Sequence, residues 1–172
     1  MKKNITSLLK SSKNIFLSTF YHLKSNFRNT NDYFEIATNY ANSNSFSSST
    51  TYFIWVDKNN FKTNIFKGSK NNWKLINSYL CTIGKPSTQT PSGNFKIGVK
   101  GLYFGVNKGY KCKYYTQFYD NYLFHSIIYN LNGSIRDGRL GMELSDGCIR
   151  LSLNNAKWIY DNIPKNTFVH IS

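Results

Sequence analysis

Hydrophobic residues form short runs, or alternate with polar residues, along most of the chain after residue 51. The runs at residues 52–56 and 122–124 are rich in β-branched and aromatic side chains, which favour strands. A polar turn at residues 58–60 separates the first run from residues 62–66, and this arrangement predicts a hairpin. Residues 167–171 alternate and predict a closing strand. The pattern therefore predicts a mainly β domain.

One helical pattern interrupts the strands. Apolar residues recur at helical spacing, namely Leu153, Ala156, Ile159 and Tyr160. Ser152 is placed to cap the first turn, and Pro164 is placed to end the helix. We expect a helix that follows the loop of Cys148.

The N-terminal third differs from the rest of the chain. Residues 1–30 place apolar residues at helix-like spacing among lysines, which predicts a basic amphipathic helix of the kind that contacts anionic membrane surfaces. A helix packed on the domain and a partly ordered tail are the alternatives. Lys10 and Lys13 interrupt the apolar run that a signal peptide needs, and no stretch is long enough for a membrane span.

Residues 39–51 are rich in serine and asparagine, which predicts a linker. We therefore divide the chain into a basic segment with a linker, residues 1–50, and one folded domain, residues 51–172. A hydrophobic content of 40% is sufficient for a single packed core.

The chain is strongly basic, with 22 Lys and Arg residues against 8 Asp and Glu residues and a formal net charge of +14. Such a surface attracts nucleic acid, anionic lipid or anionic wall polymer. The alternative is a solvated lysine-rich surface with no specific partner. We expect no nucleic-acid binding, because the sequence has no helix-turn-helix, RNP or zinc motif.

Three cysteines are present without a CxxC pair, and the histidines lack zinc-ligand spacing, so no metal site is expected. Cys112 lies between Lys111 and Lys113, which predicts a surface thiol. Cys81 lies in an apolar run and is expected in the core. A disulfide between Cys81 and Cys112 stays open.

Cys148 has the surroundings of a nucleophile. Gly147 allows a tight turn that can direct backbone amides toward an oxyanion while the thiolate attacks a carbonyl. His125, at the end of an apolar strand, is a candidate base for this thiol. The pair alone does not separate a catalytic site from a buried cysteine and an unrelated histidine.

Three motifs resemble those of a known family. Residues 145–150 read Ser-Asp-Gly-Cys-Ile-Arg and closely resemble the SHGCxR/N signature of L,D-transpeptidases of the YkuD type. His125 and Ser126 are similar to the family's upstream histidine motif. Residues 83–97 resemble its TGKP…TPxGxFxI segment. The motifs occur in the family's order and separation, and the resemblance extends from about Tyr52 to Ile171.

This resemblance implies an L,D-transpeptidase-like β-sandwich or barrel in which the cysteine loop faces a cleft and a helix follows. It implies that the cysteine forms a thioester with a donor peptidoglycan stem peptide and passes the acyl group to an amine of a neighbouring stem, without a cofactor. It also implies acylation by carbapenems and an extracytoplasmic location, at the cell wall or the outer face of the membrane. The alternatives are an L,D-carboxypeptidase on the same stems and a catalytically impaired wall-binding homologue.

The resemblance assigns roles to four residues of the reaction. Cys148 is the nucleophile and His125 is the general base. Ser126 matches the residue whose backbone carbonyl orients that histidine. The amides of Gly147 and Cys148 would form the oxyanion hole.

Five further residues are candidate substrate contacts. Arg150 could hold a carboxylate or brace the loop. Asp146 replaces the histidine of the signature, and its carboxylate should oppose thiolate formation unless Arg150 neutralises it. Tyr115, Gln117 and Tyr122 belong to an aromatic segment that covers the cleft in the family, with ordinary strand packing as the alternative.

Overall fold

The computed structural model describes residues 32–172. The chain divides into two compact units, Met1–Asn39 and Tyr40–Ser172. The basic amphipathic helix expected at residues 1–30 lies outside the described residues. Residues 32–43 are helical, and this helix crosses the boundary between the units. Within residues 32–172, no helix has the length and apolar character needed to cross a membrane.

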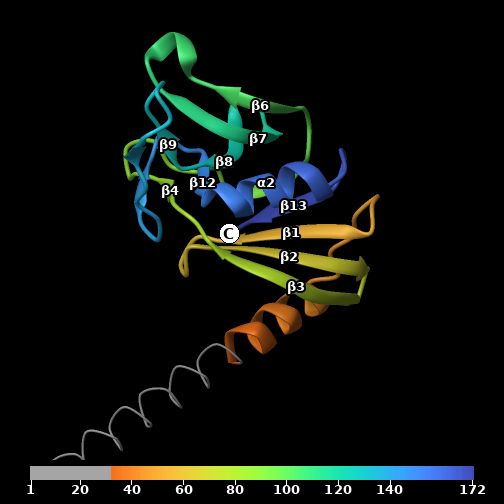
Figure 1. Cartoon of the computed structure of the whole chain (residues 1–172). Helices are drawn as coiled ribbons and strands as arrows, with labels where there is room; N and C mark the ends of the chain where they lie inside the picture. Colours follow the sequence, from red (N-terminus) through yellow and green to blue (C-terminus); the bar gives the residue numbers. More distant parts are fainter. Residues whose placement is uncertain (1–31) are drawn as a thin grey trace, which may run out of the picture. The chain divides into compact units, whose positions relative to one another are not determined.

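Five strands form the first sheet, in the order β3-β2-β1-β13-β5. Figure 1 shows β3, β2, β1 and β13 in this order. They are β1 (Tyr52–Asp57), β2 (Lys62–Ser69), β3 (Asn72–Leu80), β5 (Gly93–Lys96) and β13 (Phe168–Ile171). β1 and β2 are antiparallel, with Asp57 opposite Lys62, so the predicted hairpin is present. The last strand, β13, runs parallel to β1 and completes the centre of the sheet.

A second sheet has the order β10-β9-β7-β8-β12, with β6 paired to β7. Its strands are β6 (Lys100–Phe104), β7 (Lys111–Tyr119), β8 (Tyr122–Ser126), β9 (Ile128–Tyr129), β10 (Ile135–Asp137) and β12 (Ile149–Leu151). A 3-10 helix, η1 (Val106–Lys108), joins β6 to β7. A short parallel pair, β4 (Ile83–Gly84) and β11 (Glu143–Ser145), stands beside these sheets.

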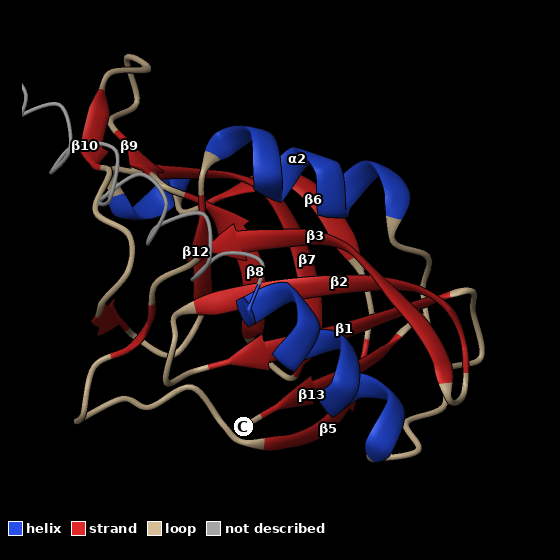
Figure 2. Ribbon diagram, turned by 90° about the horizontal axis from the view of Figure 1, so that it is seen from below, coloured by secondary structure: helices blue, strands red, loops and turns tan. Residues whose placement is uncertain are grey.

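The predicted helix is present as α2 (Leu153–Asn162), and the Ser152 side chain accepts a hydrogen bond from the Asn155 amide at 3.3 Å. Its buried residues Ala156 and Ile159 join a core that includes residues of both sheets. Figure 2 shows that strands dominate the described chain and that helices contribute only short segments. The mainly β prediction is confirmed.

Residues 40–50 pack on the first sheet, whereas their composition predicted a linker. The Tyr40 ring stacks on Trp55 at a centroid distance of 4.1 Å, and the Phe46 ring lies 5.0 Å from Phe53. The Trp73 indole also donates to the Phe46 carbonyl at 3.0 Å. Two aromatic anchors are enough to hold a polar segment on an apolar surface. The domain boundary at residues 50 and 51 stays a prediction.

Candidate active site

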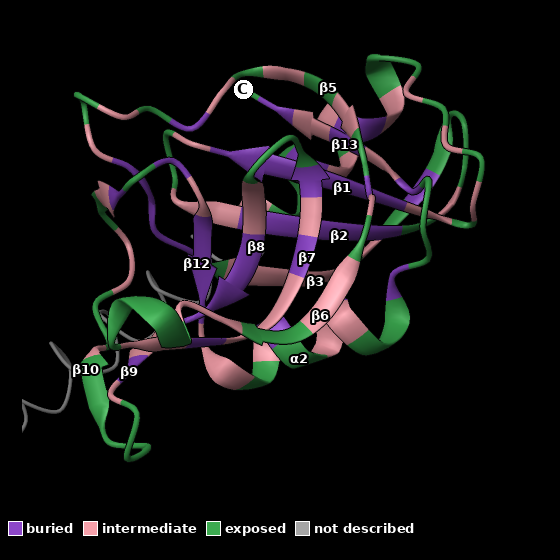
Figure 3. Cartoon of the chain, turned by 90° about the horizontal axis from the view of Figure 1, so that it is seen from above, coloured by how far each residue is buried: buried purple, intermediate pink, exposed green. Residues whose placement is uncertain are grey.

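A cavity of about 270 Å³ brings together four of the nine candidate site residues, namely His125, Asp146, Cys148 and Arg150. Its lining includes Phe104, Tyr110, Cys112, His125, Arg136, Ser145, Asp146, Cys148 and Arg150. Figure 3 shows that β12 and the end of β8 beside it are buried. Within residues 32–172, no group of three or more His, Cys, Asp or Glu side chains is placed to hold a metal ion.

The parallel pairing of β8 with β12 brings the candidate base and nucleophile together. His125 lies opposite Arg150, and Cys148 is two residues before Arg150, at the start of β12. Both side chains line the same cavity. Adjacent strands of a rigid sheet therefore hold His125 and Cys148 as neighbours across the site.

His125 is held in one orientation. Its Nδ1 lies 2.6 Å from the Ser126 backbone carbonyl, and its ring meets Phe104 edge to face at 5.2 Å. A carbonyl can only accept, so Nδ1 carries the proton and Nε2 keeps its lone pair. This is the contact that the resemblance implied for Ser126, and it leaves Nε2 able to accept a proton.

Burial makes His125 a neutral base. The pKa of the imidazole is lowered from 6.5 to about 4, mainly by loss of solvent; the Ser126 hydrogen bond opposes this shift, and the Arg150 charge contributes to it. The side chain is 5% exposed. At neutral pH the ring is therefore uncharged.

Acid should destabilise the fold through His125. The folded pKa lies below the unfolded one, so between about pH 6.5 and pH 4 the unfolded chain binds a proton that the folded chain does not. Stability should fall as pH decreases through this window, by roughly 3 kcal/mol in the free energy of unfolding at its lower end. Urea unfolding of the parent and of His125→Gln at pH 4 to 7.5 measures this.

In His125→Gln, the free energy of unfolding should lose most of its dependence on pH, because glutamine does not titrate. His170 also has a pKa lowered by burial, so His170→Gln serves as the matched control and should retain the His125 contribution. If the parent and His125→Gln lost stability in parallel, the assignment to His125 would be wrong.

Cys148 is half-buried at the rim of the cavity. Its Sγ donates a weak hydrogen bond to the Asn121 carbonyl at 3.7 Å. Burial raises the pKa of the thiol, a backbone hydrogen bond from Leu123 lowers it, and the Asp146 charge raises it. The resting site thus pairs a neutral imidazole with a protonated thiol, and attack requires that the proton leave as the bond forms.

The turn before Cys148 depends on glycine. Gly147 has φ +107°, and a Cβ there would lie 2.5 Å from the Tyr122 ring. The Ser145 hydroxyl accepts from the Gly147 amide at 3.1 Å and donates to the Cys148 carbonyl at 2.6 Å. The expectation that the Gly147 amide serves the oxyanion hole is therefore wrong, since Ser145 occupies that amide. The Cys148 amide makes no turn or loop hydrogen bond among the described residues.

Arg150 supports the wall of the cavity through an ion pair with Asp137. It is 4% exposed, and its Nη1 donates to Asp137 at 2.9 Å. Asp137 also accepts from Arg139, and Arg139 first and then Arg150 hold the pKa of this carboxyl far below its usual value. The Arg150 Nε is buried without a protein partner among the described residues. Of the two roles expected for Arg150, bracing is the one that its contacts fill.

Asp146 points away from this network. Its side chain is 83% exposed and pairs with Lys85 at 2.5 Å. The expected neutralisation by Arg150 is wrong, because Arg150 is committed to Asp137 and Lys85 from the β4 side reaches Asp146 instead. Asp146 is the smallest of the named influences on the Cys148 pKa.

Removing the Asp146 charge should therefore have a small effect. Asp146→His should lower the Cys148 pKa and raise its alkylation rate near pH 7 by on the order of twofold at low salt, the size expected of an exposed, screened charge. Asp146→Asn should match it, and Lys85→Met should change the rate in the opposite direction. Alkylation mapped to Cys148 by mass spectrometry measures all three. A tenfold gain restricted to Asp146→His would show that the ring itself matters.

The three polar or aromatic candidates outside the motifs do not line the cavity. Tyr122 packs over Gly147 and thereby supports the turn. Tyr115 lies against Gly101 and meets Phe104 edge to face at 5.9 Å. It therefore packs on Phe104, which lines the cavity, and does not line the cavity itself. Gln117 is engaged by backbone, since its side chain contacts the Asp120 carbonyl and the Val99 amide.

Cys112 is buried in the cavity wall, and the prediction of a surface thiol is wrong. Along β7, the side chains of Lys111 and Lys113 lie over the rings of Tyr103 and Tyr129, whereas Cys112 between them turns inward and is 1% exposed. Burial raises the pKa of its thiol to about 12. Strand alternation explains the error, because flanking charges say nothing about the opposite face.

Other outcomes concern residues that motifs did not mark. Cys81 is fully buried in the core as expected, and all three cysteines are free thiols. Arg136, which no motif marked, lines the cavity; its Nη1 donates to the Gly109 carbonyl at 3.2 Å. Asp137 was missed as well, although its position between two arginines, Arg136 and Arg139, was a usable signal.

Comparison with known proteins agrees with this geometry. The sequence model of the YkuD L,D-transpeptidase catalytic domain matches residues 51–171. YciB of Bacillus subtilis (strain 168), whose name proposes an L,D-transpeptidase, is 30% identical over 131 residues, which are 69% of this chain and 66% of YciB.

Solved structures share the fold. One is a fused Zn-dependent amidase/peptidase/peptidoglycan-binding domain-containing protein from Clostridium acetobutylicum ATCC 824, with 43% identity and a TM-score of 0.72, over 84% of this chain and 62% of that chain. Another is the L,D-transpeptidase LdtMt1 in complex with imipenem, with 20% identity and a TM-score of 0.56, over 71% of this chain and 59% of that chain. This chain thus spans about two thirds or less of the length of these proteins.

Proposed function

Because this chain belongs to the L,D-transpeptidase family, as the match of its residues 51–171 shows, we propose that it is a cysteine acyltransferase that cross-links peptidoglycan stems through a thioester on Cys148. One observation carries the proposal. Cys148 and His125 line a single cavity, and the bond from Nδ1 to the Ser126 carbonyl leaves the neutral His125 with Nε2 able to accept a proton. A thiol and an oriented neutral imidazole form a nucleophile and general base.

The first half-reaction makes the thioester. His125 Nε2 takes the Cys148 proton while Sγ bonds to the carbonyl carbon of the donor stem, and the oxyanion forms against the Cys148 amide. The C–N bond to the terminal D-amino acid then breaks, and the imidazolium returns the proton to the departing amine. One amide has been exchanged for a thioester, and the thiol proton of Cys148 has left with the amine.

The second half-reaction exchanges the thioester for a new amide. The acceptor amine attacks the thioester carbonyl and gives a proton to His125 Nε2, and the C–S bond then breaks. The imidazolium reprotonates the Cys148 thiolate as it leaves. The free enzyme is regenerated, and no cofactor or external energy source is consumed.

Positive charge in the cavity supports a carboxylate-bearing donor. Arg136 lines it, and its guanidinium can attract a carboxylate in a partly desolvated site, whereas Arg150 is engaged by Asp137. A donor whose terminal D-amino acid keeps a free carboxylate would be attracted by this positive charge.

Intact-mass measurement with imipenem tests the thioester chemistry. The protein should gain the mass of one imipenem, and the adduct should map to the Cys148 peptide. LdtMt1 has been solved in complex with imipenem, which supports the choice of probe. An unmodified parent protein, or an adduct on Cys81 or Cys112, would contradict the proposal and favour the impaired homologue.

Muropeptide analysis after incubation with stem tetrapeptides tests the transfer step. New cross-linked dimers are the expected products. Shortened stems without dimers would identify an L,D-carboxypeptidase, in which water resolves the thioester.

We also propose an extracytoplasmic site of action, because the substrate lies there and a net charge of +14 suits an anionic wall. Protease accessibility in intact cells that express the full chain checks this. Protection of the protein until lysis would overturn it.

A further inference from the structure

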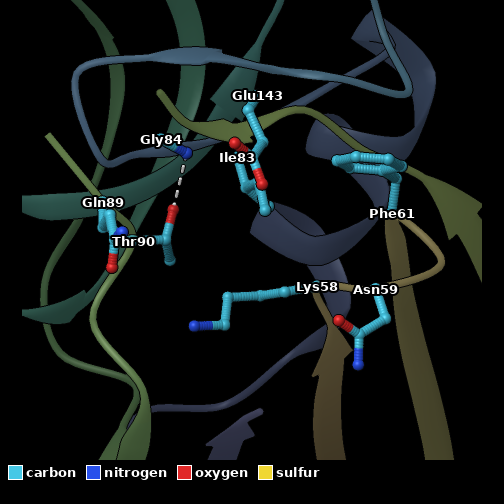
Figure 4. A pocket seen from close by; sticks show the side chains of 8 residues that line it. All are labelled: Lys58, Asn59, Phe61, Ile83, Gly84, Gln89, Thr90 and Glu143. Atoms are coloured by element: carbon cyan, nitrogen blue, oxygen red, sulfur yellow. Dashed lines mark hydrogen bonds between the residues drawn. The ribbon is translucent and has the colours of Figure 1, made fainter. Parts of the chain in front are cut away.

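Thr90 is a buried residue that holds the backbone of the cysteine loop from a distant part of the sequence. It is 2% exposed, and its Oγ1 donates to the Gly147 carbonyl at 2.8 Å. The same oxygen accepts from the Gly84 amide at 2.9 Å (Figure 4). The hydroxyl therefore has both its donor and its acceptor capacity in use, and one of these bonds ends on the peptide that joins Gly147 to Cys148.

Thr90 does not line the cavity that contains Cys148 and His125. It lines a second cavity, of about 290 Å³, which also includes Lys58, Gln89 and Glu143 (Figure 4). Thr90 thus reaches the Gly147–Cys148 peptide directly, through the Gly147 carbonyl, and its other bond ends on Gly84, which pairs with Ser145.

We propose that Thr90 is a positioning residue that fixes the Gly147–Cys148 peptide so that the Cys148 amide faces the reacting carbonyl. The inference rests on the proposed function. In a trans peptide the carbonyl and the N–H point in opposite directions, and the described chain has no cis peptide. A carbonyl held on the Thr90 side therefore directs the Cys148 N–H to the other side.

The orientation of the Cys148 amide needs an external hydrogen bond because the residue before it is Gly147. Gly147, with φ +107°, is the residue type whose backbone rotates most freely, so the peptide after it has no side chain to restrain it. The other amide of the turn is engaged by Ser145, which leaves the Cys148 amide to receive the oxyanion. A hydrogen bond to the carbonyl also polarises the peptide and strengthens its N–H as a donor.

The bond from Thr90 to the Gly147 carbonyl is one of several hydrogen bonds between residues 84–90 and residues 145–147. Thr88 donates through Oγ1 to the Ser145 carbonyl at 3.1 Å, and the Lys85 amide donates to the same carbonyl at 2.9 Å. These bonds hold the segment that carries Ser145, whereas the Thr90 bond alone reaches the peptide of the nucleophile. This separates the role of Thr90 from general anchoring of the loop.

Thr90→Val tests the proposal in the full chain, since valine keeps the shape and removes the hydroxyl. The rate of acylation by imipenem at saturation should fall by roughly tenfold to a hundredfold, somewhat less than the loss of a whole oxyanion donor. The imipenem concentration that gives half the maximal rate should change little. Alkylation of Cys148 by iodoacetamide should proceed at the parent rate, because displacement at a saturated carbon forms no oxyanion.

Two matched variants complete the experiment. Thr90→Ser keeps the hydroxyl and should acylate within about twofold of the parent rate. Thr167→Val removes a buried hydroxyl that contacts Thr50 at 2.9 Å, outside the site, and should leave acylation unchanged. If Thr90→Val does not fold, Thr90→Ala removes the same hydroxyl without a methyl group against the Gly84 amide, and the same split is expected.

Three outcomes would overturn the inference. Thr90→Val or Thr90→Ala could acylate at the parent rate, acylation and alkylation could fall together, or Thr90→Ser could lose as much as Thr90→Val. A parent protein that imipenem does not acylate would instead refute the proposed function, so the two failures can be told apart.

Discussion

Cys148→Ala should abolish acylation by imipenem and all turnover of stem peptides, while the protein folds as the parent does. The change removes the only atom that forms the covalent bond. Little stability should be lost, because the side chain is half-buried and its hydrogen bond to the Asn121 carbonyl is long at 3.7 Å. Intact mass and urea unfolding measure the two effects.

The control for this variant is Cys81→Ala, a change of the same kind in the core and away from the cavity. It should acylate normally and lose stability. Cys112 is the rival nucleophile, since it lines the cavity, but burial raises the pKa of its thiol to about 12 and keeps it protonated. An adduct that persists in Cys148→Ala and maps to Cys112 would show that the nucleophile has been assigned to the wrong sulfur.

His125→Ala should lower the acylation rate by about a hundredfold or more near neutral pH, the usual size of a general-base contribution. The reason is that the Cys148 pKa is raised by burial, so the thiol needs a base to lose its proton. The residual rate should increase with pH as the thiolate forms without help. A pH profile of the acylation rate for parent and variant measures both features.

His170→Ala is the matched control for this change. Its ring bonds to Tyr40 and Asn94, far from the cavity, so acylation should be unaffected. His125→Gln should be nearly as slow as His125→Ala, because it restores a polar group but no basic nitrogen. Parent-like acylation by either His125 variant near pH 7 would exclude His125 as the base.

The sequence by itself determined the strands, the helix and the candidate reacting pair. Alternation in residues 52–66 and helical spacing after Ser152 are local patterns, and local backbone preferences set them. The glycine before Cys148 was equally readable, since a tight turn requires a residue that accepts a positive φ. The motifs around Cys148 and His125 placed both residues in one family, and the structure brings them to one cavity.

Only the tertiary structure decided which partner each polar group takes. Arg150 pairs with Asp137 rather than Asp146, although Asp146 is closer in sequence, because the fold brings the Asp137 carboxylate within 2.9 Å of the Arg150 side chain. The Gly147 amide is engaged by Ser145, and the Gly147 carbonyl by Thr90. Such choices depend on distances between segments that no local pattern encodes.

Contacts between distant segments also explain why some residues are buried where the sequence led us to expect them at the surface or in a linker. Cys112 was expected at the surface because of two flanking lysines, yet strand alternation turned it into the cavity. Residues 40–50 were expected to be a linker, yet Tyr40 and Phe46 found aromatic partners on the first sheet. Composition describes what a segment contains, whereas burial depends on the surface that the rest of the fold presents to it.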